Sequence, residues 1–319
     1  GNQWGLHALF AAAAGPSTVQ AEPPENALFR PCGVGFGGDL TLIEAGVLAG
    51  NGGLVLGGEL AQLVMLPAGS DVVVLDKDQQ GLGIRPVLNV DPSRRVASAR
   101  CKQLQLPEGR VLKGAAPAPI RLARVLSAAE ASGGARACTE MATDHAKVRE
   151  QFGRTIGTFQ AVKHHFANML VAAEQATAGA WGAVHSDLSE KDAAPSAAAA
   201  LAIVAFVHNA ELNIQVLGGI GYTWEHAAHL YLRKATALGA PIGPIDSARE
   251  DVFELMNEGV EPRATVELPE EAEAFRAELR PVVDKVCALP EDERRRALAD
   301  SGYLVPHWPK PFGRDAGAV

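Results

Sequence analysis

Residues Arg149–Gln160 read R-E-Q-F-G-R-T-I-G-T-F-Q and separate two long segments whose apolar residues recur at helical spacing. The segment before them, residues 120–147, is rich in Ala, Leu, Val and Met, a composition that favours a buried helix. The segment after them, residues 162–173, repeats apolar side chains at steps of three and four. Gly153 and Gly157 interrupt helical continuity between the two. The sequence therefore predicts two packed helices joined by a short turn that carries basic and amide side chains.

The basic residue at the start of this turn is Arg149. A guanidinium at such a corner can form a bidentate hydrogen bond to a phosphate group. An ion pair with Glu150 or Glu140 is the simpler interpretation on residue chemistry alone. Both interpretations stay open at this point.

The composition is that of a soluble globular protein. The chain has 319 residues, of which 47% are hydrophobic and 21% are charged, and its formal net charge is -8. This length suits roughly two domains. The longest basic run, Arg294–Arg296, is short and lies among acidic residues, so we expect no nucleic-acid partner. We also expect no membrane segment, because the apolar stretch at residues 9–14 is too short to span one.

The cysteines indicate a reducing compartment, and we predict a cytoplasmic protein. They are far apart in the chain and show no C-x-x-C spacing, so free thiols are expected rather than disulfides or zinc. The histidines have no carboxylate or cysteine companions at ligand spacing, and no metal site is predicted. The four cysteines are Cys32, Cys101, Cys138 and Cys287.

Turn signals and apolar runs divide the chain. Short apolar runs between glycines and prolines, roughly eight to ten residues apart, predict a small β-sandwich or barrel. Long helix-forming segments follow and predict an antiparallel four-helix bundle. The expected domains are an irregular segment at 1–39, a β domain at 40–117, the bundle at 118–245, a linker at 246–267, and the start of a further helical domain at 268–319.

Two motifs together resemble the acyl-CoA dehydrogenase family. They are the turn at Arg149–Gln160 and Q-V-L-G-G-I-G-Y-T-W-E-H at Gln215–His226, followed by Tyr231–Ala235. The resemblance implies an α+β fold with a β middle domain and a C-terminal four-helix bundle. Residues 268–319 resemble the first helices of a second copy. The chain therefore looks like the central piece of a tandem-fused bacterial acyl-CoA dehydrogenase, with the sterol side-chain type as one candidate.

The family resemblance implies FAD and an oligomer in which the bundle reaches a neighbouring subunit's flavin. Carried over by motif, Arg149 would bind the FAD pyrophosphate, and Gln151 and Phe152 would line the adenosine end. Glycine lets backbone approach a pyrophosphate closely, and a guanidinium neutralises its charge. The second motif would meet the same region through an amide and backbone groups: Gln215, Leu217, Gly218 and Gly219.

The positions of the family's catalytic glutamate are occupied by other residues. The two known positions correspond here to Ala123 and Ile242, and neither side chain can take a proton. Glu130 is the nearest acid downstream of Ala123 and is expected to be structural. The family's motif for the flavin ring is also altered in residues 30–39, where Arg30 stands in place of an acid.

These features predict half of an FAD-dependent acyl-CoA dehydrogenase, an oxidoreductase of fatty-acid or steroid degradation. Its own site would be inactive, and it would contribute FAD contacts to a neighbouring active site. The expected partners are an acyl-CoA (a steroid-CoA is one candidate), electron-transfer flavoprotein, and further subunits in a homo-oligomer or fused-half pseudo-tetramer. A different hypothesis is a scaffold that binds no cofactor and serves oligomer packing. A third is an active site whose base lies outside this segment.

Overall fold

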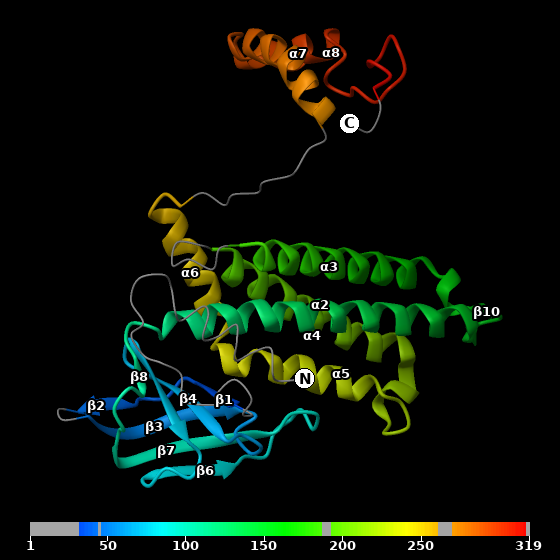
Figure 1. The fold of residues 1–319 in the computed structure, drawn as a ribbon. Helices are drawn as coiled ribbons and strands as arrows, with labels where there is room; N and C mark the ends of the chain where they lie inside the picture. Colours follow the sequence, from blue (N-terminus) through cyan, green and yellow to red (C-terminus); the bar gives the residue numbers. More distant parts are fainter. Residues whose placement is uncertain (1–31, 44–45, 187–192, 261–269, 317–319) are drawn as a thin grey trace. The chain divides into compact units, whose positions relative to one another are not determined.

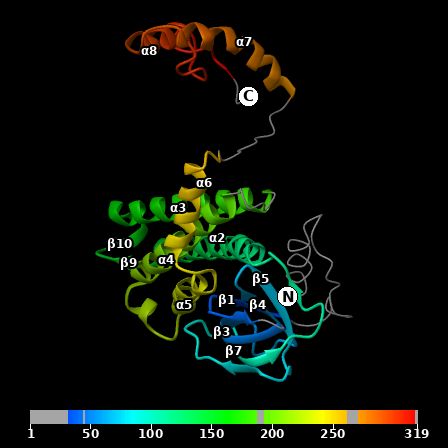
Figure 2. The ribbon, with the colours of Figure 1, turned by 90° about the vertical axis from the view of Figure 1, so that its left-hand side faces the viewer.

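The computed structural model describes residues 32–43, 46–186, 193–260 and 270–316 (Figure 1). The chain forms two compact units, Gly1–Pro262 and Arg263–Val319. The first unit contains a β-sheet followed by a group of long helices, which lie together on one side of the sheet in both Figure 1 and Figure 2. The predicted α+β class is therefore confirmed.

The sheet has eight strands in the order β6-β7-β3-β1-β4-β5-β8, with β2 paired to β3. All neighbouring pairs are antiparallel except β1 and β4, which run parallel. The strands are β1 Cys32–Phe36, β2 Thr41–Ile43, β3 Val47–Leu56, β4 Leu63–Ala68, β5 Asp71–Asp76, β6 Leu82–Pro86, β7 Val96–Gln105 and β8 Val111–Leu112.

Strands β4 and β5 are buried on both faces. Val64 and Leu66 point into the main core of the sheet, whereas Leu63 and Met65 point to a second cluster that includes Ala115, just before the first long helix. Alternating side chains on opposite faces explain why these strands read as continuous apolar runs in the sequence. A single sheet with both faces covered differs from a sandwich, which needs two sheets.

The β region begins earlier than predicted, because β1 lies within residues 1–39, which were expected to be irregular. Its glycines are strand residues at positions where a side chain would not fit. A Cβ atom on Gly35 would lie 2.5 Å from Leu66 Cδ2, and one on Gly33 would lie 2.8 Å from Val55 Cγ1. Glycine in a strand often marks such a close approach.

The helical part contains α2 Pro117–Val148, α3 Gln160–Val184, α4 Ala194–Leu217 and α5 Ala228–Leu238. Its core is built mainly from alanines, which let the helices approach closely. The largest fully buried side chain is Phe206 of α4, and a Cβ atom on Gly134 of α2 would lie 2.3 Å from its ring. Asn209, also fully buried, donates to the carbonyl oxygens of Ala135 and Met169 and so joins α4 to α2 and α3.

A further helix, α6 Ile245–Asn257, occupies much of the segment predicted as a linker at 246–267. The charge-rich sequence suggested a linker, but α6 buries Ala248 and contacts α4 through one face, as an amphipathic surface helix does. Helix α4 with the turn after it, Ala194–Tyr222, is long and apolar enough to cross a membrane, but 56% of that window is buried inside the protein. A core helix has the same property, so this is weak evidence for a membrane span.

The second unit contains α7 Glu270–Cys287 and α8 Glu291–Asp300. Helix α7 continues through Pro281, although proline within a helix removes a backbone hydrogen bond. Arg314 pairs with Glu278 of α7 and its guanidinium lies 4.3 Å from the centre of the Tyr303 ring. Three aromatic side chains of this unit, Phe275, Trp308 and Phe312, are exposed.

Candidate functional site

The turn between α2 and α3 is a two-residue β-hairpin. Strands β9 Glu150–Gln151 and β10 Arg154–Thr155 pair, and Phe152 and Gly153 between them both have positive φ angles of 54° and 77°. Positive φ at both central residues is the geometry of a tight hairpin turn, and it is rare for a bulky residue. The turn leaves the Phe152 side chain 91% exposed. The exposed ring of Phe152, in a turn with an unfavourable φ angle, is therefore accessible to a ligand or to another protein.

Arg149 lies directly after α2 and before this hairpin. Its backbone N–H donates to the carbonyl oxygen of His145 (2.9 Å), and its own carbonyl oxygen accepts from Ile156 N–H (2.8 Å). The backbone is therefore fixed on both sides, while the side chain is exposed. Among the described residues, no carboxylate lies within ion-pair distance of its guanidinium, and neither Glu150 nor Glu140 pairs with it.

Two histidines lie near Arg149. The pKa of His145, one helical turn earlier, is lowered by its partial burial and by the positive charges of Arg149 and His226. His226 is held in place because its Nδ1 accepts the backbone N–H of Ala228 (3.1 Å). The exposed guanidinium of Arg149 could bind an anionic ligand at this corner.

The second predicted group lies at the end of α4. Gln215 is exposed, and Gly218 ends the helix with φ 65° and ψ -137°. Nothing lies within 4 Å of the positions where Cβ atoms would stand on Gly218 and Gly219, so their backbone faces open space. Leu217 is 5% exposed, which means that only its backbone could meet a ligand.

The structure brings both groups to the same end of the bundle. Met141, near the end of α2, packs against a small core made by Ile214 and Leu217 of α4 and Ala228 of α5. His226, next to the second group, is close enough to His145 to influence its pKa. The two motifs, about one helical hairpin apart in the sequence, therefore lie at the same end of the bundle, the end of α2 that carries β9 and β10 (Figure 1).

The expected positions of a catalytic base hold no acid. Ala123 is half-buried on α2, and Ile242 is 6% exposed in the short turn η5, Ala240–Ile242. Glu130, the nearest acid downstream of Ala123 in the sequence, binds Arg94 and Lys234, with its oxygen 2.9 Å from Lys234 Nζ. Both contacts agree with the structural role expected of Glu130.

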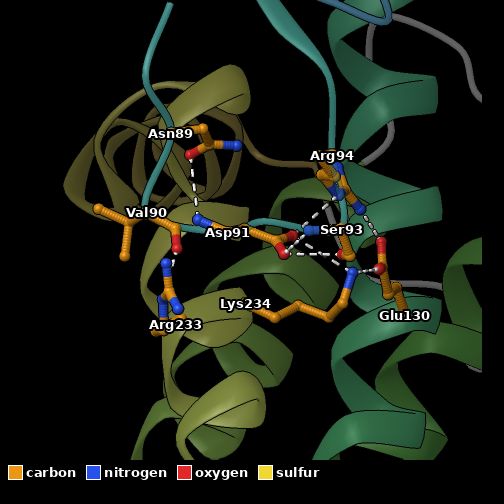
Figure 3. Close-up of polar contacts among 8 residues, drawn as sticks. All are labelled: Asn89, Val90, Asp91, Ser93, Arg94, Glu130, Arg233 and Lys234. Atoms are coloured by element: carbon orange, nitrogen blue, oxygen red, sulfur yellow. Dashed lines mark hydrogen bonds and ion pairs between the residues drawn. The ribbon is translucent and has the colours of Figure 1, made fainter.

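Glu130 belongs to a polar network that joins the β region to the helices (Figure 3). Asp91 is 1% exposed and accepts from Ser93 N–H (2.9 Å) and Ser93 Oγ (2.7 Å), and it lies 3.3 Å from Lys234 Nζ. Burial alone would raise the pKa of Asp91, but Ser93 and Lys234 outweigh it, so the pKa is lowered. Arg233 of α5 adds a bond to the carbonyl oxygen of Val90 (2.7 Å). Sequence reasoning missed this network, because its members lie up to 143 residues apart.

Comparisons with known proteins assign the helical part to a family of similar sequences. Residues 115–256 match the family model described as acyl-CoA dehydrogenase, C-terminal domain. The matched range begins just before α2 and ends in α6, and it includes the whole candidate surface. This match and the relatives described next support the assignment of the chain to the acyl-CoA dehydrogenase family.

Two curated relatives come from Mycobacterium tuberculosis. Acyl-CoA dehydrogenase FadE34 is 41% identical over 84% of this chain and 38% of its own length. Acyl-CoA dehydrogenase IpdE2 is 32% identical over 57% of this chain and 53% of its own length. The chain thus spans only about two fifths to one half of these relatives.

Solved structures share the fold. Glutaryl-CoA dehydrogenase from Mycobacterium smegmatis in complex with FADH2 has a TM-score of 0.66 at 15% identity, covering 76% of this chain and 72% of that one. The Tcur3481-Tcur3483 steroid ACAD has a TM-score of 0.63 at 24% identity, covering 70% and 63%. These similarities indicate that the sheet and helices form the acyl-CoA dehydrogenase fold.

Proposed function

We propose that this chain is one half of an FAD-dependent acyl-CoA dehydrogenase, an oxidoreductase that acts on the α,β-carbon bond of an acyl-CoA. In this proposal, the end of its bundle contacts the adenosine and pyrophosphate of an FAD whose ring and catalytic carboxylate belong to a neighbouring active site. The observation that carries the proposal is the exposed Arg149 guanidinium, which has no carboxylate partner in the part of the chain that the structure describes.

The residues at this end of the bundle fit FAD. Arg149 would neutralise the pyrophosphate, and the open backbone at Gly218 and Gly219 would let its oxygens approach. Gln215 would add an amide hydrogen bond, and Gln151 and the exposed ring of Phe152 would lie along the adenosine. Leu217 would contribute only backbone groups, because its side chain is packed in the small core with Ile214 and Ala228.

FAD, when bound, supplies the acceptor for the hydride that leaves the β-carbon. The residues of this chain would bind and orient that cofactor, not transfer a proton. Removal of the α-proton needs a carboxylate beside the thioester. With Ala123 and Ile242 at the two positions where the family places that carboxylate, this chain's own cleft would be inactive.

A longer, two-copy protein accounts for the features outside the bundle. The aligned part of FadE34 is 38% of a protein more than twice as long as this chain, which leaves room for a second copy. Helices α7 and α8 would then be the first helices of that copy, and their exposed aromatic side chains would be covered by the rest of its domain. The assembly would be a fused-half pseudo-tetramer or a homo-oligomer.

The proposed substrate is an acyl-CoA, with a steroid-CoA as the specific candidate. Two observations favour the steroid: the altered base positions resemble asymmetric pairs of that type, and a solved structure with this fold is named a steroid ACAD. The proposed electron acceptor is electron-transfer flavoprotein, and the proposed compartment is the cytoplasm. The free thiols of Cys32, Cys101, Cys138 and Cys287 suit that compartment.

A scaffold that binds no cofactor is the competing proposal. It requires Arg149, Gln215 and the two open glycines to lie together without a ligand. The site explains their arrangement better, because an exposed guanidinium and exposed glycine backbone are the groups that pyrophosphate recognition uses.

The test is the flavin content of the complete protein. Arg149→Ala removes charge-assisted hydrogen bonds that contribute about 1.5–3 kcal/mol, so the Kd for FAD should rise roughly 10- to 150-fold. The matched control is Arg136→Ala, an exposed arginine of α2 that pairs with Glu174. Wild type and control should purify yellow, and Arg149→Ala should lose flavin on gel filtration. An Arg149→Ala protein with undiminished flavin would contradict the site, and a colourless wild type would favour the scaffold.

A further inference from the structure

One face at the end of α2 carries Met141, His145 and Arg149, each four residues from the next. Side chains at this spacing lie one above another on the same face of a helix. Met141 packs against the small core that contains Ala228, and His226 Nδ1 accepts the backbone N–H of Ala228 (3.1 Å). His145, one turn beyond Met141, therefore lies on the side of α2 that faces His226, between that histidine and Arg149.

The two histidines can take up a proton, but Arg149 opposes this in the free protein. His145 is half-buried, and its pKa is lowered by that burial and by the positive charges of Arg149 and His226. Its imidazole is therefore mostly neutral at pH 7. Because Nδ1 of His226 accepts a backbone N–H, the neutral ring of His226 carries its proton on Nε2.

The other charged groups at this end of the bundle do not neutralise the pair. Asp144, next to His145 in the chain, is bound to Lys147 (2.9 Å). Within the described part of the chain, no ion pair joins an acid to His145 or His226. Other titratable side chains on the hairpin, at the start of α3 and around the start of α5 are Glu150, Arg154, His165, Glu225 and His229.

A diphosphate bound to Arg149 would change the balance of charge on His145. Its negative charge would offset the positive charge that keeps the imidazole neutral, and an opposite charge nearby favours the protonated ring. The coupling is reciprocal: if the anion raises the affinity for a proton, the proton raises the affinity for the anion by the same factor.

We propose that FAD binds at Arg149 together with a proton that His145 and His226 take up, so that the affinity for FAD rises as the pH falls. The inference rests on the proposed function, because it concerns the same diphosphate. The two rings titrate as one pair, since protonation of either opposes protonation of the other. At high pH the pair is neutral with and without FAD. As the pH falls, the FAD complex takes up the proton before the free protein does, and the Kd decreases.

The test is a calorimetric titration of FAD into the complete protein from which flavin has been removed. Heats measured near pH 7 in two buffers of different ionisation enthalpy, PIPES and imidazole, give the number of protons taken up for each FAD bound. We expect about 0.3–1 proton for each FAD, and a Kd about three- to tenfold lower at pH 6 than at pH 8.

Two variants assign the proton to the pair. His145→Gln removes the titrating ring and keeps a polar amide, so the proton uptake should fall by about half or more. His226→Asn should have a similar effect, while its Oδ1 can replace Nδ1 as the acceptor for Ala228 N–H. The matched control is His185→Gln, because His185 is exposed at the other end of α3 from the hairpin, and its uptake should equal that of wild type.

The proposal is overturned if wild type takes up no proton on binding FAD, if its Kd is the same at pH 6 and pH 8, or if neither variant reduces the uptake. If His145→Gln does not fold, the wild-type titration and His226→Asn decide the question. FAD binding that depends on Arg149 but takes up no proton would leave the proposed function standing. FAD binding that Arg149→Ala does not weaken would contradict the proposed function itself.

Discussion

The buried carboxylate of Asp91 connects the β region to the helices. Asp91→Asn should lower the stability of the protein, although the side-chain volume hardly changes. The side chain is 2% exposed and accepts two hydrogen bonds from Ser93 while facing Lys234 at 3.3 Å and Arg94 at 3.7 Å. Asparagine keeps the size and one acceptor oxygen. It removes the negative charge between two cations and turns an NH2 group toward one of them (Figure 3).

The expected loss follows from burial. Hydrogen bonds to a charged group contribute about 1.5–3 kcal/mol, against about 1 kcal/mol for neutral ones, so we expect Asp91→Asn to cost about 2–3 kcal/mol. Glu130→Gln is the comparison, because its carboxylate binds the same Lys234 but is 35% exposed. Exposed pairs contribute about 0–1 kcal/mol, so that variant should lose at most about 1 kcal/mol. Thermal unfolding should show a Tm lower by roughly 4–12 °C for Asp91→Asn and by less than about 4 °C for Glu130→Gln.

The difference between wild type and Asp91→Asn should depend on pH. The pKa of Asp91 is lowered in the folded protein, so its stabilising contribution is complete above the unfolded carboxyl pKa of about 3.9. It is lost as the pH falls through the lower folded value. The two Tm values should therefore converge in acid. Equal Tm values at pH 7, or a difference that does not shrink below pH 4, would refute the reasoning.

Two further predictions concern packing and reactivity. Gly134→Ala should destabilise the bundle by about 1–3 kcal/mol, because the new Cβ would lie 2.3 Å from the Phe206 ring. Gly133→Ala, which has open space around it, should instead stabilise α2 by about 0.5–1 kcal/mol. Equal effects of the two variants in chemical denaturation would contradict this packing. Burial raises the pKa of Cys32 to about 12, of Cys101 to about 11 and of Cys138 to about 12, whereas Cys287 is exposed. Iodoacetamide at pH 8 should therefore modify Cys287 alone in the folded protein, as read by mass spectrometry, and rapid modification of Cys138 would show that the bundle core is open.

The sequence allowed the helical part and the candidate surface to be predicted because their signals are local. Helical spacing on both sides of Arg149–Gln160, with glycines between, specified two helices and a turn. The second motif added the end of α4, where a glycine with positive φ ends the helix. These are short-range rules, and the structure follows them.

Other features could not be predicted, because they depend on residues far apart in the chain. The sequence around Gly33 and Gly35 suggests a loop, because the side chains of Val55 and Leu66 that occupy the space beside these glycines come from distant strands. Arg124 finds Ser196 and Asp251, which lie 72 and 127 residues further along. Helix α6 was not predicted, because its sequence is rich in charged residues and only one of its faces packs against the bundle. Tertiary packing decided each of these cases.

The most direct measurement is a structure of the complete protein with its flavin bound. We expect FAD density at the end of the bundle, with the Arg149 guanidinium hydrogen-bonded to the pyrophosphate at about 2.7–2.9 Å and the flavin ring in a neighbouring half that carries the acid. Flavin seated wholly in this chain's own cleft, with Arg149 turned to solvent or to an acid of its own bundle, would contradict it.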